Sequence, residues 1–162
     1  MKKRLTLIQM DVRVNDVEYN YNRVQELLTQ SLSESPDIIV LPETWNTGFY
    51  PSTDLINIAD NNGARTKALL SAFAKEHNVN IVGGSVAVAK DNLVFNTSYV
   101  YNRNGELVGE YSKMHGFSPA KEDKYFASGT HTTHFELDGI PCSTVICYDI
   151  PVSYTHLTLP TT

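Results

Sequence analysis

The chain has 162 residues, of which 41% are hydrophobic and 19% charged, and its formal net charge is −5. These values fit one globular domain and exclude collagen-like, disordered and coiled-coil proteins. The mild acidity argues against a nucleic-acid-binding or anionic-membrane surface, and no apolar run approaches the ~20 residues of a membrane span. Two cysteines are too few for a disulfide framework. Residues 1–5 are basic, but no long apolar region or cleavage site follows them, so they do not indicate a signal peptide. We therefore expect a cytoplasmic protein.

The first half of the chain predicts strands alternating with helices. Residues 5–10 and the unbroken apolar run 38–41 are typical of strands, the second buried on both faces. Between them, apolar residues at steps of three and four predict a helix that Asn15 or Asp16 could cap. The apolar stripe of this helix consists of Val17, Tyr21, Val24, Leu28 and Leu32. Residues 45–63 show no hydrophobic periodicity and are expected to form a loop.

The second half predicts one more helix and then mainly strands. Apolar residues mark a helix around 69–77, and residues 81–86 a third strand that contains two glycines. Two hairpins follow, with strands 96–101 and 106–111 around Asn104-Gly105, and 134–137 and 142–146 around Asp138-Gly139. Helices early and hairpins later indicate a layered α/β domain with a mixed sheet.

Three reactive side chains follow predicted strands: Glu43, Lys113 and Cys147. Strand ends are where α/β sheets present functional groups. Taken singly, the glutamate and the lysine would ordinarily be solvated charges and the cysteine an inert buried thiol. Position alone therefore leaves their role open.

The sequence motifs around these residues resemble those of the nitrilase, or carbon–nitrogen hydrolase, superfamily. Residues 41–49 (LPETWNTGF), 111–117 (YSKMHGF) and 145–150 (VICYDI) occur in the order of the family's LPE, KxH and CYD motifs, which carry a Glu-Lys-Cys triad. The resemblance covers residues 4–150. It implies an α/β fold, the N-terminal part of a four-layer α-β-β-α sandwich with mixed sheets. The sequences after Glu43 and around Lys113 look most like the omega-amidase branch.

The resemblance also implies a mechanism. Cys147 would attack an amide, Glu43 would act as general base and then as acid, and Lys113 would hold positive charge near the thiolate and the oxyanion. The backbone N–H groups of Lys113 and Tyr148 would be oxyanion donors. Water and a small-molecule amide, such as 2-oxoglutaramate with release of ammonia, would be the reactants. No metal or organic cofactor is implied.

Further residues near the motifs receive supporting roles. The family's second glutamate matches Glu122, with Asp123 as the alternative, and His115 is expected to orient the lysine loop. The spacing of His131 and His134 does not complete a metal-ligand set. Three aromatic residues could line a substrate pocket or belong to the core, and both readings stay open: Trp45, Phe49 and Phe117.

The resemblance stops after residue 150. We expect residues 1–150 to be a carbon–nitrogen hydrolase domain that is incomplete at its C-terminus. Residues 151–162 contain no acidic, lysine or arginine residue and are expected to be an atypical tail, with an assembly artefact and a natural Thr-rich tail as alternatives. The full-length form is expected to be a homo-oligomer, and this chain alone to be poorly soluble or inactive. Nitrilase, N-carbamoyl amidohydrolase and a non-catalytic module are the alternative functions.

Overall fold

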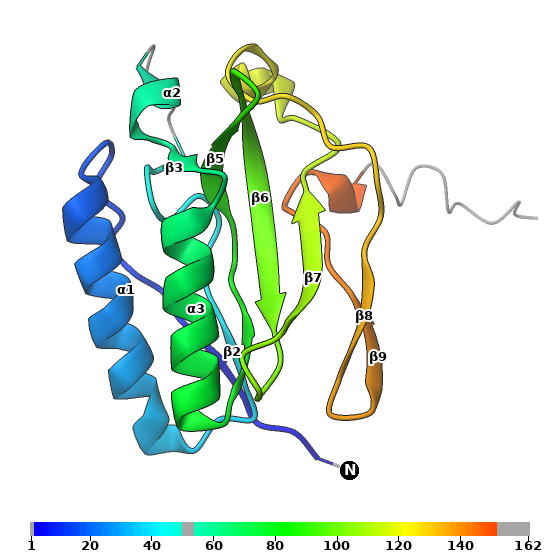
Figure 1. Cartoon of the computed structure of the whole chain (residues 1–162). Coiled ribbons are helices and arrows are strands. Elements are labelled where there is room, and N and C mark those ends of the chain that lie inside the picture. The colour runs from blue at the N-terminus through cyan, green and yellow to red at the C-terminus, as the bar shows by residue number, and fades with distance from the viewer. Residues whose placement is uncertain (1, 50–53, 152–162) are drawn as a thin grey trace, which may run out of the picture.

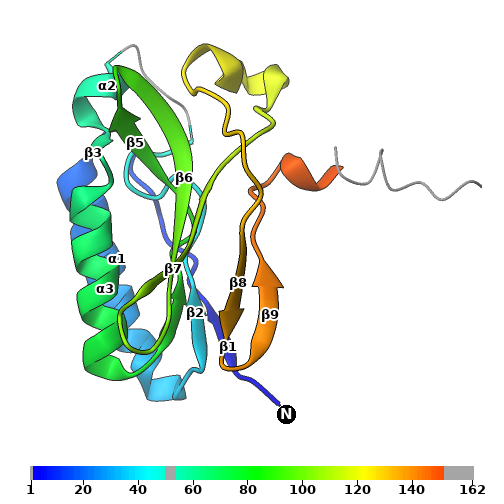
Figure 2. The ribbon, with the colours of Figure 1, turned by 45° about the vertical axis from the view of Figure 1, so that its right-hand side comes forward.

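The computed structural model describes residues 2–49 and 54–151, and these form layers of helix and sheet. Two long helices cover one face of a seven-stranded mixed sheet, and a two-stranded hairpin lies against its other face (Figures 1 and 2). Within the described ranges, no helix has the length and apolar character to cross a membrane. The helices are α1 (Val17–Ser31) and α3 (Ala64–His77), and the hairpin strands are β8 (His134–Leu137) and β9 (Ile140–Ser143).

The main sheet mixes parallel and antiparallel pairs. Strands β1, β2 and β4 run parallel, β6 runs antiparallel to β4, β5 and β7, and β3 pairs parallel with β5. The strand order is β1-β2-β4-β6-β5-β3, and β7 also pairs with β6. The strands are β1 (Leu5–Leu7), β2 (Ile38–Val40), β3 (Asp60–Asn61), β4 (Asn80–Val82), β5 (Val86–Lys90), β6 (Leu93–Tyr101) and β7 (Leu107–Ser112).

Helix α1 confirms the periodic pattern that predicted it. The Asp16 side chain caps it by accepting a hydrogen bond from the Tyr19 backbone N–H at 3.2 Å, so Asp16 rather than Asn15 is the N-cap. The apolar stripe, including Val24 and Leu28 at 0% exposure, packs on the sheet. Helix α3 likewise confirms the second predicted helix and begins five residues earlier than the stripe that marked it.

Strand alternation divides the interior into two parts. Ile39 points toward the helices, whereas Ile38 points to the opposite face and packs with Leu137 of the hairpin. The apolar run 38–41 is therefore buried on both faces, as predicted. On the hairpin side, Leu5 and Leu7 of β1 remain 56% and 69% exposed.

The prediction of a loop over residues 45–63 is wrong for its last part. A short helix, α2 (Leu55–Ile58), and strand β3 form there. Leu55 is buried against Ala87, Val94 and Phe126, so these elements depend on tertiary burial that no short sequence period reveals.

The prediction of one strand over residues 81–86 is also wrong, because the chain forms two strands with a break between them. Val100 pairs with Val82, and Thr97 with Val86, while both also pair with β7. Strands β4 and β5 therefore share one edge of β6, and residues 83–85 form a bulge between them. Strand β5 has no counterpart among the predicted elements.

Both predicted hairpins are confirmed, with shifted ends. Strands β6 and β7 flank Asn104-Gly105, and β8 and β9 flank Asp138-Gly139. The last strand ends at Ser143 rather than at residue 146. Cys147 thus follows a short loop and not a strand directly.

We predict that Gly84→Ala destabilises the fold far more than Gly139→Ala. Both glycines have positive φ, +58° and +79°, where an Ala side chain costs about 1 kcal/mol. An added Cβ at Gly84 would lie 2.0 Å from the Pro42 carbonyl oxygen, whereas nothing lies within 4 Å at Gly139. Urea unfolding should give a loss of about 3 kcal/mol or more for Gly84→Ala. Equal losses for the two variants would contradict the close approach at the bulge.

Candidate active site

The bulge between β4 and β5 positions Glu43. The Ser85 N–H donates to the Pro42 carbonyl at 3.0 Å, the Thr44 N–H donates to the Ser85 hydroxyl at 3.0 Å, and the Trp45 N–H donates to the Ser85 carbonyl at 3.1 Å. These bonds bracket Glu43 on both sides. They hold the turn that follows β2 against the bulge, and so fix where the Glu43 side chain starts.

Trp45 anchors this turn from inside the core. Its side chain is fully buried, its Nε1 donates to the Gly83 carbonyl at 3.0 Å, and its ring meets Tyr21 edge-on with centroids 4.8 Å apart. Trp45 therefore belongs to the core on the helix side. The alternative expectation, a position lining a substrate pocket, is corrected by this burial.

Lys113 lies at the centre of the site. Its side chain is 2% exposed, and its Nζ lies 2.9 Å from Glu43 Oε1 and 2.8 Å from Glu122 Oε2. A buried ammonium needs such partners, because an unpaired one would lose its hydration without compensation. Burial, the largest influence, works to lower the pKa of Lys113, but the hydrogen bonds and charges of Glu122 and Glu43 outweigh it and hold this pKa above its usual value. Lys113 therefore stays charged.

The structure corrects one expected role of Lys113. Its backbone N–H donates to the Asn96 carbonyl at 2.9 Å and so continues the β6–β7 ladder. This N–H is already used and cannot also serve as an oxyanion donor. The Tyr148 N–H, by contrast, forms no hydrogen bond within the part of the chain that the structure describes.

Glu122 joins the site from the 3-10 helix Glu122–Lys124. It is 3% exposed and accepts hydrogen bonds from Lys113, from Asn96 Nδ2 at 3.2 Å and from the Phe117 N–H at 2.8 Å. Asp123, the alternative from the sequence, is exposed. Of the two acidic residues, Glu122 is thus the one that contacts Lys113.

Asn96 is a site residue that the sequence analysis did not single out. Its Nδ2 donates to Glu43 Oε1 at 3.0 Å as well as to Glu122 Oε1, so one amide bridges the two carboxylates. The reverse orientation would place its oxygen against both of them, so the bridge fixes the amide. The available signal was weak, because the predicted strand 96–101 begins at Asn96, where an asparagine is ordinary, whereas β6 begins at Leu93 and buries it.

Cys147 lies on a turn with strained backbone. Its φ is +48°, a value that costs a non-glycine residue about 1–2 kcal/mol. Burial of the thiol, the charge of Glu43 and a hydrogen bond to Glu43 raise the pKa of Cys147, and the charge of Lys113 works against this rise. The residue as a whole is exposed, so a reagent can reach it. Glu43, Lys113 and Cys147 are therefore close enough to act on one another.

The structure places the remaining expected residues as follows. The rings of Phe117 and Tyr148 pack against each other with centroids 5.3 Å apart, and Tyr148 directly follows Cys147 in the chain. His115 contacts Asp149 through its backbone N–H and through Nδ1, both at 2.9 Å. Phe49 is partly buried at the end of the described range 2–49.

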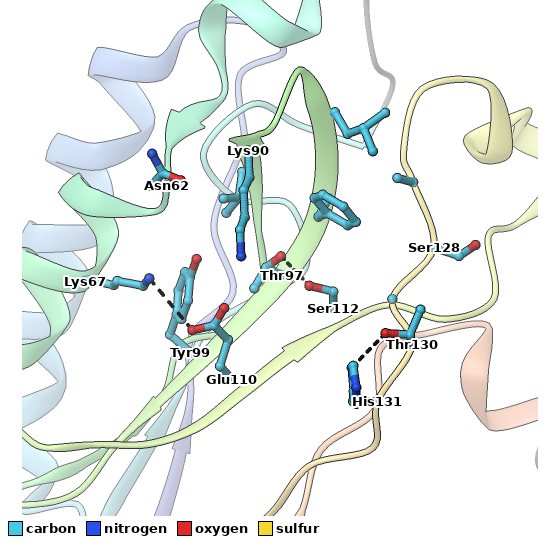
Figure 3. Close-up of a pocket in the computed structure, with 15 residues that line it drawn as sticks. Asn62, Lys67, Lys90, Thr97, Tyr99, Glu110, Ser112, Ser128, Thr130 and His131 are labelled. Carbon is cyan, nitrogen blue, oxygen red and sulfur yellow. Dashed lines mark hydrogen bonds and ion pairs between the residues drawn. The ribbon is translucent and has the colours of Figure 1, made fainter.

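A pocket of about 510 Å³ lies elsewhere, on the helix side of β6 and β7 (Figure 3). Thr97 and Ser112 line it, with their hydroxyl oxygens 2.9 Å apart. Their neighbours Asn96 and Lys113 point to the opposite face, because side chains alternate along a strand. The sheet therefore separates this pocket from the residues around Cys147.

The described ranges contain no cluster of three or more His, Cys, Asp or Glu side chains that could hold a metal ion. The His131 Nδ1 lies 2.7 Å from the Thr130 hydroxyl. Most of the segment 151–162 lies outside the described residues, so the structure says nothing of it.

Known proteins resemble this chain in sequence. A 2-oxoglutaramate amidase of Bacillus subtilis is 38% identical over 150 residues, which are 93% of this chain and 57% of that protein. A chloroplastic omega-amidase of Arabidopsis thaliana is 27% identical, over 92% of this chain and 43% of its own length. The chain thus spans about half the length of these relatives.

A solved structure has the same fold. A CN-hydrolase superfamily protein of Xanthomonas campestris, which carries an arsenic adduct in its active site, superposes with a TM-score of 0.81 at 29% identity. The match covers 92% of this chain and 54% of that one. Residues 4–159 also match the sequence model of the family described as carbon-nitrogen hydrolase. The chain therefore belongs to the carbon–nitrogen hydrolase family.

Proposed function

We propose that the protein carrying this chain hydrolyses an amide through a thioester on Cys147, with Glu43 and Lys113 completing a catalytic triad. The observation that carries the proposal is the pairing of the buried Lys113 ammonium with Glu43 and Glu122 beside an accessible thiol. Amides resist attack, so their hydrolysis needs a strong nucleophile, a base and a stabilised oxyanion. This constellation supplies all three.

In the first half-reaction, Glu43 takes the proton of the thiol. Its Oε1 accepts hydrogen bonds from Lys113 and Asn96, so we assign the proton transfer to Oε2. The thiolate then attacks the carbonyl carbon of the amide and forms a tetrahedral intermediate. When the carbon–nitrogen bond breaks, Glu43 returns the proton to the leaving nitrogen, and the acyl group remains on Cys147 as a thioester.

In the second half-reaction, water takes the place of the leaving amine. Glu43 removes a proton from the water, the resulting hydroxide attacks the thioester, and the thiol leaves as it regains a proton. The carboxylic acid product and free Cys147 result. The Tyr148 N–H and the Lys113 ammonium stabilise the oxyanion in both halves, and one such donor contributes about 3 kcal/mol to the transition state.

The substrate we propose is the terminal amide of a keto acid, such as 2-oxoglutaramate, with ammonia as the leaving group. The names of the relatives from Bacillus subtilis and Arabidopsis thaliana support this choice. A primary amide also suits a site in which one proton carrier, Glu43, serves both the thiol and the leaving nitrogen.

Cys147→Ala should abolish hydrolysis of 2-oxoglutaramate, measured as ammonia released by the full-length protein, because no other group can form the thioester. Cys142→Ala is the matched control: Cys142 lies on β9 and donates its S–H to the Ile140 carbonyl, away from the triad. This control should keep full activity. Residual turnover in Cys147→Ala would refute the covalent mechanism. Faster turnover of a nitrile or an N-carbamoyl amino acid than of the amide would refute the substrate class.

Glu43→Gln should make the Cys147 thiol easier to alkylate and at the same time slow the hydrolysis of the amide. The negative charge of Glu43 raises the pKa of Cys147, so the neutral amide should lower it and let iodoacetamide alkylate the thiol at lower pH. Loss of the base should meanwhile reduce hydrolysis about 100-fold or more. Alkylation, followed by mass spectrometry of the Cys147 peptide, and an ammonia assay measure the two effects.

Glu136→Gln provides the control for this experiment, since Glu136 is an exposed carboxylate on β8 and should leave both properties unchanged. An alkylation midpoint of Glu43→Gln at or above that of the unchanged protein would contradict the assignment of Glu43 as the neighbour of the thiol.

A further inference from the structure

The turn that carries Cys147 is not part of a strand. Strand β9 ends at Ser143, helical residues begin only at 149, and Cys147 itself has a positive φ. Local hydrogen bonds span the turn, from the Asp149 N–H to the Ile146 carbonyl and from the Ile150 N–H to the Cys147 carbonyl, both at 3.1 Å. These bonds shape the turn but do not connect it to the lysine segment.

The Asp149 carboxylate makes that connection. Its side chain is 3% exposed. Oδ2 accepts hydrogen bonds from the Tyr111 hydroxyl at 2.6 Å and from the Ile146 N–H at 3.1 Å. Oδ1 lies 2.9 Å from both the backbone nitrogen and Nδ1 of His115. One buried carboxylate thus contacts β7, the loop after β7 and the peptide that precedes Cys147.

The partners of Asp149 flank Lys113 on both sides. Tyr111 precedes it by two residues and His115 follows it by two. A carboxylate that served only its own turn would need only the bond to Ile146. The other contacts reach across 34 to 38 residues of chain.

We propose that Asp149 is a positioning residue that latches the Cys147 turn to the Lys113 segment and so keeps the thiol within reach of the ammonium. The role rests on the proposed function in that Cys147 is taken as the nucleophile. In this proposal Asp149 takes no part in the bond-making and bond-breaking steps. It acts by fixing the register of two segments that no strand pairing joins.

The test asks whether the thiol still senses Lys113 when the latch is weakened. Glu43, Lys113 and Glu122 are charged groups that act on Cys147. In the full-length protein with Cys142→Ala, iodoacetamide alkylation against pH reports the ionisation of Cys147 alone. Lys113→Met should move the alkylation midpoint to higher pH, because it removes the positive charge that favours the thiolate.

Asp149→Asn should reduce this response. An amide offers one acceptor oxygen and one donor group, so it must give up the contacts with His115 or those with Tyr111 and Ile146. We expect Lys113→Met to shift the midpoint less than half as far with Asp149→Asn present as without it. A shift of the same size in both backgrounds would overturn the proposal, because a residue that merely stabilises the fold would leave the response to Lys113 intact.

Asp138→Asn is the matched structural control. Asp138 is a carboxylate with two ion pairs, to Lys3 and Arg103 at 2.8 Å each, on the turn of the β8–β9 hairpin. It should lower thermal stability and preserve the full response to Lys113→Met. If circular dichroism shows that Asp149→Asn does not fold, Tyr111→Phe decides instead: a reduced response supports the latch, and an undiminished one overturns it.

The experiment separates the two proposals. Ammonia release from 2-oxoglutaramate by the unchanged protein tests the proposed function, whereas the thiol measurements need no turnover. A protein that hydrolyses no amide but loses the response in Asp149→Asn would refute the function and retain the latch.

Discussion

The candidate site depends on one buried charge, the ammonium of Lys113. A lysine side chain that is 2% exposed is tolerated only because Glu43 and Glu122 both lie within hydrogen-bond distance of it. Removing either carboxylate would leave the buried ammonium less well compensated. The ends of β2 and β7 and the 3-10 helix at Glu122 must therefore meet at this point.

The surrounding fold is arranged to allow that meeting. The bulge at residues 83–85 lets the backbone after β2 approach closely, since Gly84 has no Cβ that would strike the Pro42 carbonyl. Trp45 then fastens the same turn to the core. Asn96, in the middle of β6, donates hydrogen bonds to Glu43 and Glu122, the same two carboxylates that bind Lys113. The backbone features and the charged centre thus depend on each other.

Much of this arrangement could be predicted from the sequence, where local patterns are strong. The stripe of α1, the apolar run of β2 and the Asn-Gly and Asp-Gly turns each identify their element within a few residues. The motifs around Glu43, Lys113 and Cys147 identified the three residues that the fold brings near one another. In each case the information lies in a short stretch of chain.

What could not be predicted depends on contacts between distant segments. The break between β4 and β5 is visible only once both strands are paired with β6. Helix α2 depends on the packing of Leu55 against Ala87 and Phe126, which lie far away in the chain. The family resemblance assigned the backbone N–H of Lys113 to the oxyanion. Its hydrogen bond to the Asn96 carbonyl becomes visible only when the register of β6 and β7 is known. The sequence could not decide whether Trp45 lines a pocket or belongs to the core, because that depends on which face of the sheet its side chain packs against.

The charges at the site impose opposing demands on Cys147, and this opposition explains why position matters so much there. Burial and Glu43 favour the protonated thiol, while Lys113 favours the thiolate. The balance changes with small displacements, because interactions between charges in a poorly hydrated site vary steeply with distance. The balance therefore requires that the turn carrying Cys147 be held in place relative to Lys113. The contacts of Asp149, which join the turn to both sides of Lys113, supply the constraint that the strand pairing does not.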